Sequence, residues 1–196
     1  YVDLLSQGLS DPELEAEILV RCGAELDRIR GIIGDLLDYA RPENLPFQPV
    51  EVENLVSEAL ARVELMPPFR GIVLKMSVAD ALPSVRIQRE KVDQVLLNLL
   101  LNAADVLAGS GSIELVAVAD GDFISIRCLD SGPGFALSAL DQLFEPFFTT
   151  KQPGAGTGLG LAISLRIAKS QSGSLEAGNR DGGGAWVCLK LPLVKT

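Results

Sequence analysis

The sequence predicts an α+β fold: a two-layer α/β sandwich, with a mixed sheet packed on helices, that follows one long helix of a truncated helical hairpin. Two observations favour this class. Segments with helical periodicity and strand-like segments are mixed along the chain, whereas a doubly wound sheet requires strict alternation. The 196 residues are 47% hydrophobic, which is enough for a packed core.

The first predicted element is a helix of roughly thirty residues, read from its apolar periodicity, that begins at residues 10–13. Asp11 can cap this helix, and Pro12 suits its first turn. Its apolar stripe consists of Ile18, Cys22, Leu26, Ile29, Ile33, Leu36 and Ala40. Because a small domain cannot cover so long a stripe, we expect a partner helix, and residues 1–7 resemble its last turns. The plainer alternative is a two-helix fragment of any bundle.

Residues 42–47 contain two prolines and predict a linker between the hairpin at 1–41 and a domain at 48–196. Within that domain, helices are expected at 52–64, 90–107 and 158–170. Strands are expected at 72–78, 85–88, 112–119, 123–130, 174–177 and 185–191. Glycine-containing turns at 120–122 and 182–184 separate two pairs of these strands.

The composition limits the class of partner. Lys and Arg total 17 against 26 Asp and Glu, a net charge of −9. An acidic chain without a basic run argues against nucleic-acid binding, whose affinity comes from neutralising phosphates. It leaves nucleotide binding open, because backbone amides and a metal ion can hold phosphates locally.

The cysteines and the lack of a long apolar run indicate the cellular compartment of the chain. It has three cysteines and no CxxC pair. Cys22, Cys128 and Cys188 lie far apart, so we expect reduced thiols in a cytoplasmic protein. No apolar run approaches the ~18 residues of a membrane span, and no signal-peptide pattern opens the chain. A membrane anchor, if the protein has one, is expected upstream.

A polar stripe on an otherwise apolar helix is the sharpest chemical signal. Its members, three or four residues apart, are Lys91, Gln94, Asn98, Asn102 and Asp105. An unpartnered buried carboxamide costs about 1–3 kcal/mol, so two on successive turns suggest a ligand. An asparagine oxygen can join phosphate oxygens around Mg²⁺. The alternative is that both asparagines bond nearby backbone or face solvent.

Asp130 ends a predicted strand and shares its face with Ile124, Ile126 and Cys128, which places its carboxylate inward. An inward carboxylate needs donors, and an adenine amine can supply one. Gly132 and Gly134 let the backbone approach such a ring without a Cβ in the way. The alternative is an aspartate that caps its own turn.

The third signal is a segment of aromatic residues and glycines. Residues 144–151 place three phenylalanines before Thr149, Thr150 and Lys151, and we expect them to anchor a mobile lid at 152–155. Lys151 could reach a phosphate. The alternating glycines at 154–160 precede an apolar helix, where free amides and the helix N-terminus attract anions. The alternative is a flexible surface loop.

In this order and spacing, the four motifs at 98–103, 130–134, 144–151 and 156–161 resemble the N, G1, F and G2 boxes of sensor histidine kinases. The resemblance extends from about residue 11 to the C-terminus. It implies a catalytic domain that binds ATP and Mg²⁺ and transfers the γ-phosphoryl group to a histidine. It also implies a homodimer formed through the dimerisation hairpin, and a response-regulator receiver domain as partner. The form of the F box is most similar to that of the nitrogen-regulation subgroup.

The resemblance assigns a role to each matching position. It implies Asn102 as the Mg²⁺ ligand and Asn98 as a catalytic residue. The residues that it implies for ATP binding are Asn98, Asn102, Asp105, Asp130, Gly132, Gly134, Thr150, Lys151, Gly156, Thr157, Gly158, Leu159 and Gly160.

Two departures from the family pattern stand out. The chain contains no histidine, and we expect the phosphoacceptor helix to lie before Tyr1. Asp105 stands where many sensor kinases carry a basic residue that contacts phosphate, so Lys151 or Mg²⁺ would have to compensate. Two other functions remain open: a gyrase- or chaperone-like ATPase, which the lack of a glutamate at position 98 disfavours, and a regulatory module that holds nucleotide without turnover.

Overall fold

The computed structural model describes residues 14, 16, 18–23, 26, 34, 45–151 and 156–193. The chain divides into two units, Tyr1–Pro42 and Glu43–Thr196. In the first unit every described residue is helical, in agreement with the predicted long helix. Ile18 of the apolar stripe is buried and Cys22 is half-buried, whereas Leu26 is exposed. The other stripe positions and the predicted helix at 1–7 lie outside the described residues.

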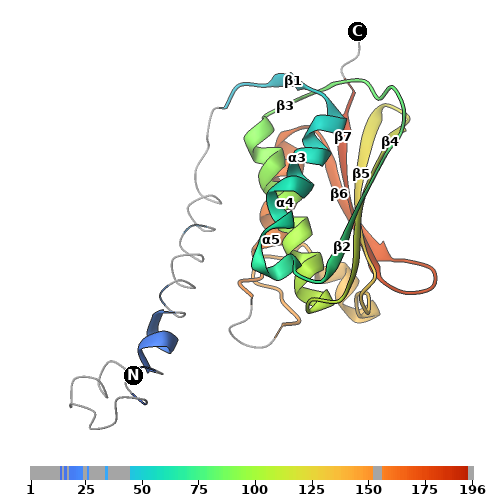
Figure 1. The fold of residues 1–196 in the computed structure, drawn as a ribbon. Helices are drawn as coiled ribbons and strands as arrows, with labels where there is room; N and C mark the ends of the chain where they lie inside the picture. Colours follow the sequence, from blue (N-terminus) through green and yellow to red (C-terminus); the bar gives the residue numbers. More distant parts are fainter. Residues whose placement is uncertain are drawn as a thin grey trace. The chain divides into compact units, whose positions relative to one another are not determined.

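The second unit is the predicted two-layer sandwich (Figure 1). Its helical layer contains α3 (Val52–Glu64), α4 (Arg89–Leu107) and α5 (Gly160–Ser170). Its five-stranded sheet has the order β2 (Ile72–Val78), β4 (Gly111–Asp120), β5 (Phe123–Asp130), β7 (Ala185–Pro192) and β6 (Ser174–Asn179). The helices cover one face of this sheet (Figure 1).

The sheet is mixed, as predicted. Strand β2 pairs with β4 in parallel, and the other neighbours are antiparallel. A separate two-stranded sheet joins β1 (Gln48–Val50) to β3 (Val85–Ile87). The strand β1 was not predicted, because three residues carry no periodicity and their pairing partner lies far along the chain. Two short 3₁₀ helices, η1 (Pro67–Phe69) and η2 (Leu137–Gln142), were also missed.

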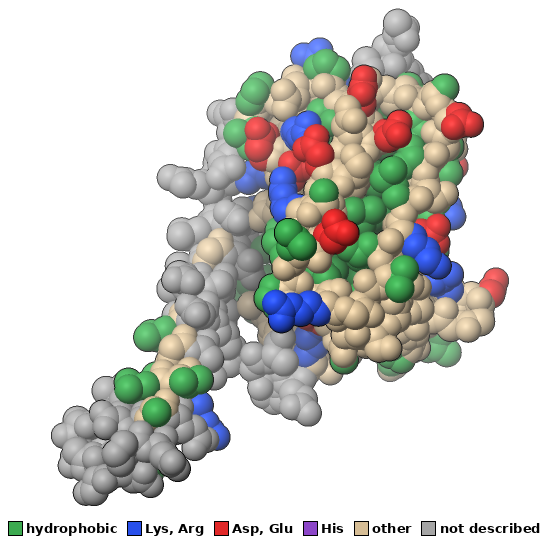
Figure 2. Space-filling view, viewed as in Figure 1, with side chains coloured by type: hydrophobic (Ala, Val, Ile, Leu, Met, Phe, Trp, Pro, Cys, Tyr) green, Lys and Arg blue, Asp and Glu red, His purple; other side chains and the backbone are tan. Residues whose placement is uncertain are grey.

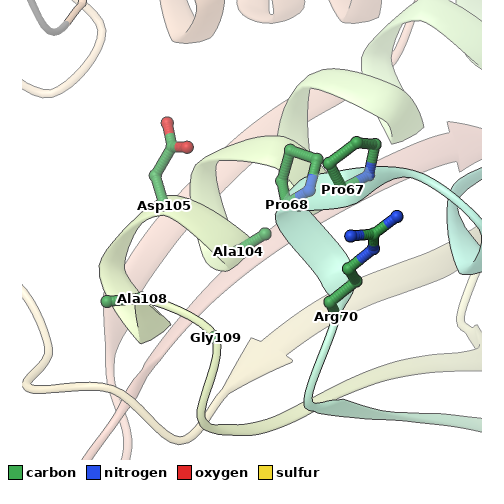
Figure 3. A pocket seen from close by; sticks show the side chains of 7 residues that line it. All are labelled: Pro67, Pro68, Arg70, Ala104, Asp105, Ala108 and Gly109. Atoms are coloured by element: carbon green, nitrogen blue, oxygen red, sulfur yellow. The ribbon is translucent and has the colours of Figure 1, made fainter.

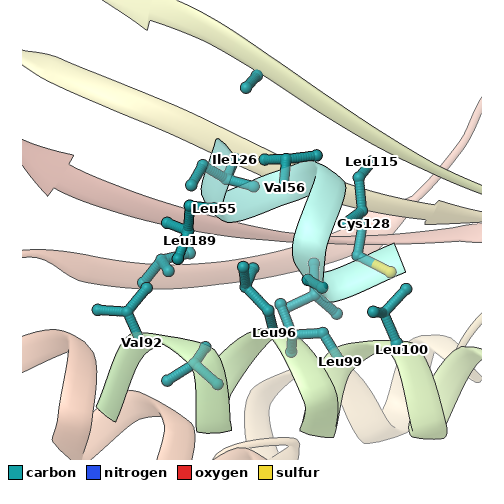
Figure 4. Packing of buried hydrophobic residues seen from close by; sticks show 14 of the residues in the cluster. Leu55, Val56, Val92, Leu96, Leu99, Leu100, Leu115, Ile126, Cys128 and Leu189 are labelled. Atoms are coloured by element: carbon teal, nitrogen blue, oxygen red, sulfur yellow. The ribbon is translucent and has the colours of Figure 1, made fainter. Parts of the chain in front are cut away.

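The core lies between α3, α4 and the inner face of the sheet (Figure 4). The α4 side chains of Leu96, Leu99 and Leu100 point toward the sheet and are 2% exposed or less. On the sheet side, Leu115 and Ile126 are fully buried. Each such side chain contributes about 1.5–3 kcal/mol by leaving water. Because this apolar face fixes the rotation of α4, its polar stripe must face away from the core.

Charged side chains join the helices at their outer surface. Arg89 of α4 forms an ion pair with Glu58 of α3, and Asp93 lies 3.6 Å from Arg62 and 3.7 Å from Arg89. The hydrogen bond to Glu58 raises the pKa of Arg89, and burial raises the pKa of Asp93 despite its two guanidinium neighbours. On the face of this unit in Figure 2, acidic and basic side chains are interspersed.

Cys128 and Cys188 are buried free thiols, and Cys22 is a half-buried free thiol. Among the described residues, no helix has both the length and the apolar character needed to cross a membrane.

Candidate ATP-binding site

The two asparagines of the α4 stripe face the N-terminus of α5. The Asn98 Nδ2 atom donates hydrogen bonds to the Gly160 carbonyl oxygen at 3.3 Å and to Ser164 Oγ at 3.4 Å. A Cβ at Gly160 would lie 3.7 Å from Asn98 Cγ and 3.8 Å from Asn102 Nδ2. Both asparagines are half-buried rather than buried, which corrects the prediction, because α5 covers only one side of the stripe. The N box and the end of the glycine segment are therefore neighbours.

Asp130 is 7% exposed at the end of β5, on the inward face as predicted. Its Oδ1 atom accepts the Gly132 N–H at 2.8 Å and the Ala185 N–H at 3.2 Å. The first of these bonds is the turn-capping arrangement that the sequence left open as an alternative. No described residue donates to Oδ2. The carboxylate thus caps its own turn and still has one oxygen for a ligand.

The Asp130 carboxylate also affects its neighbour Cys128. Burial, reinforced by the negative charge of Asp130, raises the pKa of the Cys128 thiol to about 12. The thiol is therefore neutral at physiological pH and acts as a small apolar side chain of the core.

The glycine turn after Asp130 contacts the end of α4. A Cβ at Gly132 would lie 3.0 Å from Asp130 Oδ1 and 3.2 Å from Val106 Cγ2, and Gly134 has a φ of +81°. Val106 is 46% exposed and was not among the predicted site residues. Helical periodicity places an apolar residue in the core by default, and only the fold brings this one beside the turn. An apolar side chain here is suited to contact a planar base.

The F-box aromatic residues differ in position. Phe144 packs against the core and Phe148 is half-buried, but Phe147 is 66% exposed, so the predicted aromatic anchor is only partly correct. Phe147 has a φ of +68°, and its N–H donates to the Gly158 carbonyl oxygen at 2.9 Å. A Cβ at Gly158 would lie 2.5 Å from the Phe147 carbonyl carbon. Glycine is thus required where the F and G2 boxes meet.

Lys151 does not extend into solvent but forms an ion pair with Asp105 of α4. Its N–H donates to Thr149 Oγ1 at 3.2 Å, and Thr150 is exposed. Lys151, which was predicted to reach a phosphate, is therefore bound to Asp105. Asp105 is the acidic residue at the position where many sensor kinases carry a basic one. The predicted lid at 152–155 lies outside the described residues.

The segment from Gly156 to Gly160 leads directly into α5. A Cβ at Gly156 would lie 3.0 Å from Lys151 Cδ. The Leu159 N–H donates to Thr157 Oγ1 at 3.2 Å, and the buried Leu159 precedes the first helical residue, Gly160. The first amides of an α-helix have no partner within it, so this end is suited to an anion.

A groove of about 350 Å³ lies beside the C-terminal end of α4 (Figure 3). Its lining residues are Pro67, Pro68, Arg70, Ala104, Asp105, Ala108 and Gly109. Only Asp105 is shared with the predicted site residues. The groove is therefore next to the site formed by the four boxes and is not that site.

Comparison with known proteins agrees with this geometry. Residues 87–195, more than half of the chain, match the family described as histidine kinase-, DNA gyrase B-, and HSP90-like ATPase. The chain belongs to this ATPase family. Its fold is that of histidine kinase catalytic domains: it matches the catalytic domain of the histidine kinase ThkA with a TM-score of 0.68 and 26% identity, over 76% of this chain and 96% of that one.

The relatives narrow the class to sensor histidine kinases. The sensor histidine kinase ZraS of Escherichia coli K12 is 35% identical over 169 residues, which cover 86% of this chain and 36% of ZraS. The histidine-protein kinase AtoS of the same organism is 36% identical over 196 residues, 98% of this chain and 31% of AtoS. The chain thus carries the ATPase catalytic domain of the sensor-kinase type, and it spans about a third of these relatives' length.

Full-length ShkA, solved in complex with AMPPNP, matches 98% of this chain and 42% of ShkA with a TM-score of 0.77 and 27% identity. The match extends beyond the catalytic domain into the N-terminal unit. The nitrogen-regulation subgroup and the role of each site residue stay predictions.

Proposed function

We propose that this chain binds Mg-ATP and transfers the γ-phosphoryl group to a histidine of a helical hairpin, for relay to an aspartate of a response-regulator receiver domain. The observation that carries the proposal is the approach of the α5 N-terminus to Asn98 and Asn102. It brings free backbone amides and two carboxamides to one location, which suits a metal-bound triphosphate.

In this proposal the base and the phosphates are held by different elements. Asp130 Oδ2 accepts the adenine amine, and Val106 contacts the ring beside Gly132. The amides of residues 156–160, apart from the Leu159 N–H that bonds Thr157 Oγ1, hold the phosphates, and Lys151 leaves Asp105 to join them. Asn102 supplies an oxygen to Mg²⁺. When bound, Mg²⁺ neutralises the charge on the transferring phosphoryl group.

Asn98 favours transfer over hydrolysis. A carboxamide has no basic atom at neutral pH, so it cannot take a proton from an attacking water as a glutamate could. It donates to the Gly160 carbonyl oxygen and Ser164 Oγ, which links α4 to α5. We infer that Asn98 keeps these helices in register while an imidazole nitrogen attacks the γ-phosphorus and the bond to ADP breaks.

The same proposal includes the oligomeric state and the cellular location of the chain. Two copies would pair through their helical hairpins, as the long apolar stripe of the first unit suggests. The chain would act in the cytoplasm, with any membrane anchor in another part of a longer protein.

The test is phosphorylation in trans. A fragment carrying the histidine helix of a relative such as AtoS would be mixed with this chain, Mg²⁺ and ATP labelled at the γ-phosphate. We expect label on the fragment that is lost in acid and stable in base. The control is the same fragment with its histidine replaced by alanine, which should stay unlabelled. Because this chain has no histidine, acid-labile label on it would contradict the proposal.

A further inference from the structure

We propose that Asn179 and Arg180, in the hairpin that joins β6 to β7, position the adenine-recognition loop at residues 130–135 and so determine base specificity. Neither residue belongs to the four boxes. The inference rests on the proposed function in one respect, namely that Asp130 binds adenine. The observations behind it are the hydrogen bonds and close contacts between this hairpin and the loop.

Asn179 binds both backbone polar groups of one loop residue. Its Oδ1 atom accepts the Phe135 N–H at 2.7 Å, and its Nδ2 atom donates to the Phe135 carbonyl oxygen at 2.9 Å. A Cβ at Gly134 would lie 2.7 Å from Asn179 Oδ1. The Asn179 carboxamide therefore satisfies the backbone N–H and carbonyl oxygen of Phe135, as a neighbouring strand would. It fits there only because residue 134 is a glycine.

The next hairpin residues hold the other end of the loop. The Arg180 Nη1 atom donates to the Asp130 carbonyl oxygen at 2.9 Å, and the Ala185 N–H donates to Asp130 Oδ1 at 3.2 Å. Gly184 has a φ of +92°, and a Cβ there would lie 2.1 Å from the Asp130 carbonyl oxygen. Both the backbone and the carboxylate of Asp130 are thus fixed by the hairpin.

The hairpin is itself held by Trp186. The Trp186 Nε1 atom donates to the Asn179 carbonyl oxygen at 3.2 Å, and a Cβ at Gly178 would lie 2.7 Å from the indole Cζ2 atom. The Arg180 N–H donates to the Gly184 carbonyl oxygen at 3.0 Å. Asn179 and Arg180, which donate to the loop at residues 130–135, are therefore themselves fixed by hydrogen bonds to Trp186 and Gly184.

The hydrogen bonds from the β6–β7 hairpin to the loop at residues 130–135, together called the brace, affect which base the site accepts. With Oδ1 of Asp130 occupied, the direction of Oδ2 depends on the backbone position at 130 and 135. At the 6-position of the purine ring, adenine offers an amine donor to Oδ2, whereas guanine offers a carbonyl oxygen that a carboxylate repels. If the loop loses its brace, Oδ2 loses its fixed direction, and the discrimination between the two bases falls. The phosphates, held by residues 156–160, should not be affected.

The experiment measures binding of Mg-ATP, Mg-GTP and Mg-tripolyphosphate to the whole chain by calorimetry. Relative to the unaltered chain, Asn179→Ala should bind ATP about tenfold more weakly, the loss expected for one or two hydrogen bonds. Its affinity for tripolyphosphate should stay the same, and its preference for ATP over GTP should fall. Arg180→Ala should shift the same preference in the same direction.

Two control variants separate positioning from general stability. Asn54→Ala removes an exposed asparagine of α3 that bonds Glu51, and Asp181→Ala alters the exposed tip of the same hairpin. Both should keep the base preference of the unaltered chain. If either test variant does not fold, the other one decides the test.

Amide hydrogen exchange without nucleotide provides an independent readout. In Asn179→Ala the Gly132 and Ala185 amides should exchange faster, because both donate to Asp130 Oδ1. An unchanged ATP-to-GTP preference in both test variants would overturn the inference even if exchange is faster. If the unaltered chain binds no ATP, the proposed function fails, and unchanged exchange would then reject the brace as well.

Discussion

A single oxygen atom, Oδ1 of Asp130, accepts two backbone amides from different parts of the chain. This arrangement fixes the other carboxylate oxygen without a dedicated side-chain partner. Asn98 behaves similarly, since its one amide group bonds both Gly160 and Ser164. At the residue scale, polar side chains thus join the elements around the site. The polar atoms that these hydrogen bonds do not use are available to a ligand.

The metal-ligand assignment predicts the effect of Asn102→Asp. A carboxylate at this position adds a negative charge beside the triphosphate and alters the coordination of Mg²⁺, so the affinity for Mg-ATP should fall by about tenfold or more. Calorimetry gives the affinity, and Asn54→Asp, the same change on the exposed side of α3, is the control. Equal affinity of the Asn102→Asp variant and the unaltered chain would show that Asn102 is not the ligand.

The ion pair between Asp105 and Lys151 predicts that a change at Asp105 strengthens ATP binding, whereas Asn102→Asp weakens it. Asp105→Asn removes the competitor for Lys151 and an anion near the phosphates, so ATP binding at low salt should tighten about two- to fourfold. Titrations at two salt concentrations would measure this, with the exposed Asp181→Asn as control. Weaker binding in Asp105→Asn would instead indicate that Asp105 contacts ATP directly, as the family resemblance implies.

At the scale of elements, a pair of glutamines joins the far ends of two helices. Gln171, 2% exposed after α5, accepts the Gln88 N–H at 2.8 Å and donates to Gln88 Oε1 at 2.9 Å. Gln88 in turn donates to the Leu45 carbonyl oxygen at 2.7 Å. The start of α4, the end of α5 and the segment before β1 therefore meet at one amide pair, in which Gln171 is buried and Gln88 is half-buried.

Gln171→Leu should destabilise the second unit by about 1–3 kcal/mol, because it leaves the Gln88 N–H and Oε1 without partners. Chemical denaturation followed by circular dichroism would measure this. Gln142→Leu, the same change at an exposed position of η2, should leave the stability nearly unchanged. A loss below 0.5 kcal/mol, the lower limit for a typical hydrogen bond, would mean that water replaces the pair without cost.

The elements were also the best-predicted level of the structure. The helix α3 and the strands β2 and β5 have the predicted bounds, because each combines clear periodicity with a turn at its end. What the sequence could not predict depends on contacts between distant segments. Asn179 lies 44 residues from Phe135, and no local pattern marks it as a partner of the adenine loop. Val106 and β1 were missed for the same reason.

At the scale of the whole molecule, the core and the site share one helix layer. The apolar face of α4 packs on the sheet, and its polar face meets the start of α5. The rotation that buries Leu96 and Leu100 is therefore the rotation that presents Asn98 and Asn102. Stability and nucleotide binding consequently depend on the same packing, and changes in the core should affect both.

The stability of the second unit should fall at alkaline pH partly because of Cys128. Burial, reinforced by Asp130, raises the pKa of this thiol from 9.0 to about 12. The unfolded chain ionises the thiol near pH 9 while the folded chain keeps its proton. The stabilising contribution is therefore fully present below pH 9 and is lost as the pH rises toward 12. Between pH 8 and 10 the expected loss is about 1 kcal/mol.

Chemical denaturation at pH 8 and pH 10 would measure this loss in the unaltered chain and in Cys128→Ala. The variant should be less stable at pH 8, because it leaves a small cavity beside Leu115, which pairs with Cys128 across β4 and β5. Its stability should nevertheless decline less between the two pH values, since it has no thiol to ionise on unfolding. Cys22→Ala, in the first unit, is the control and should keep the decline of the unaltered chain. An equal decline in Cys128→Ala would show that this thiol does not contribute to the alkaline loss of stability.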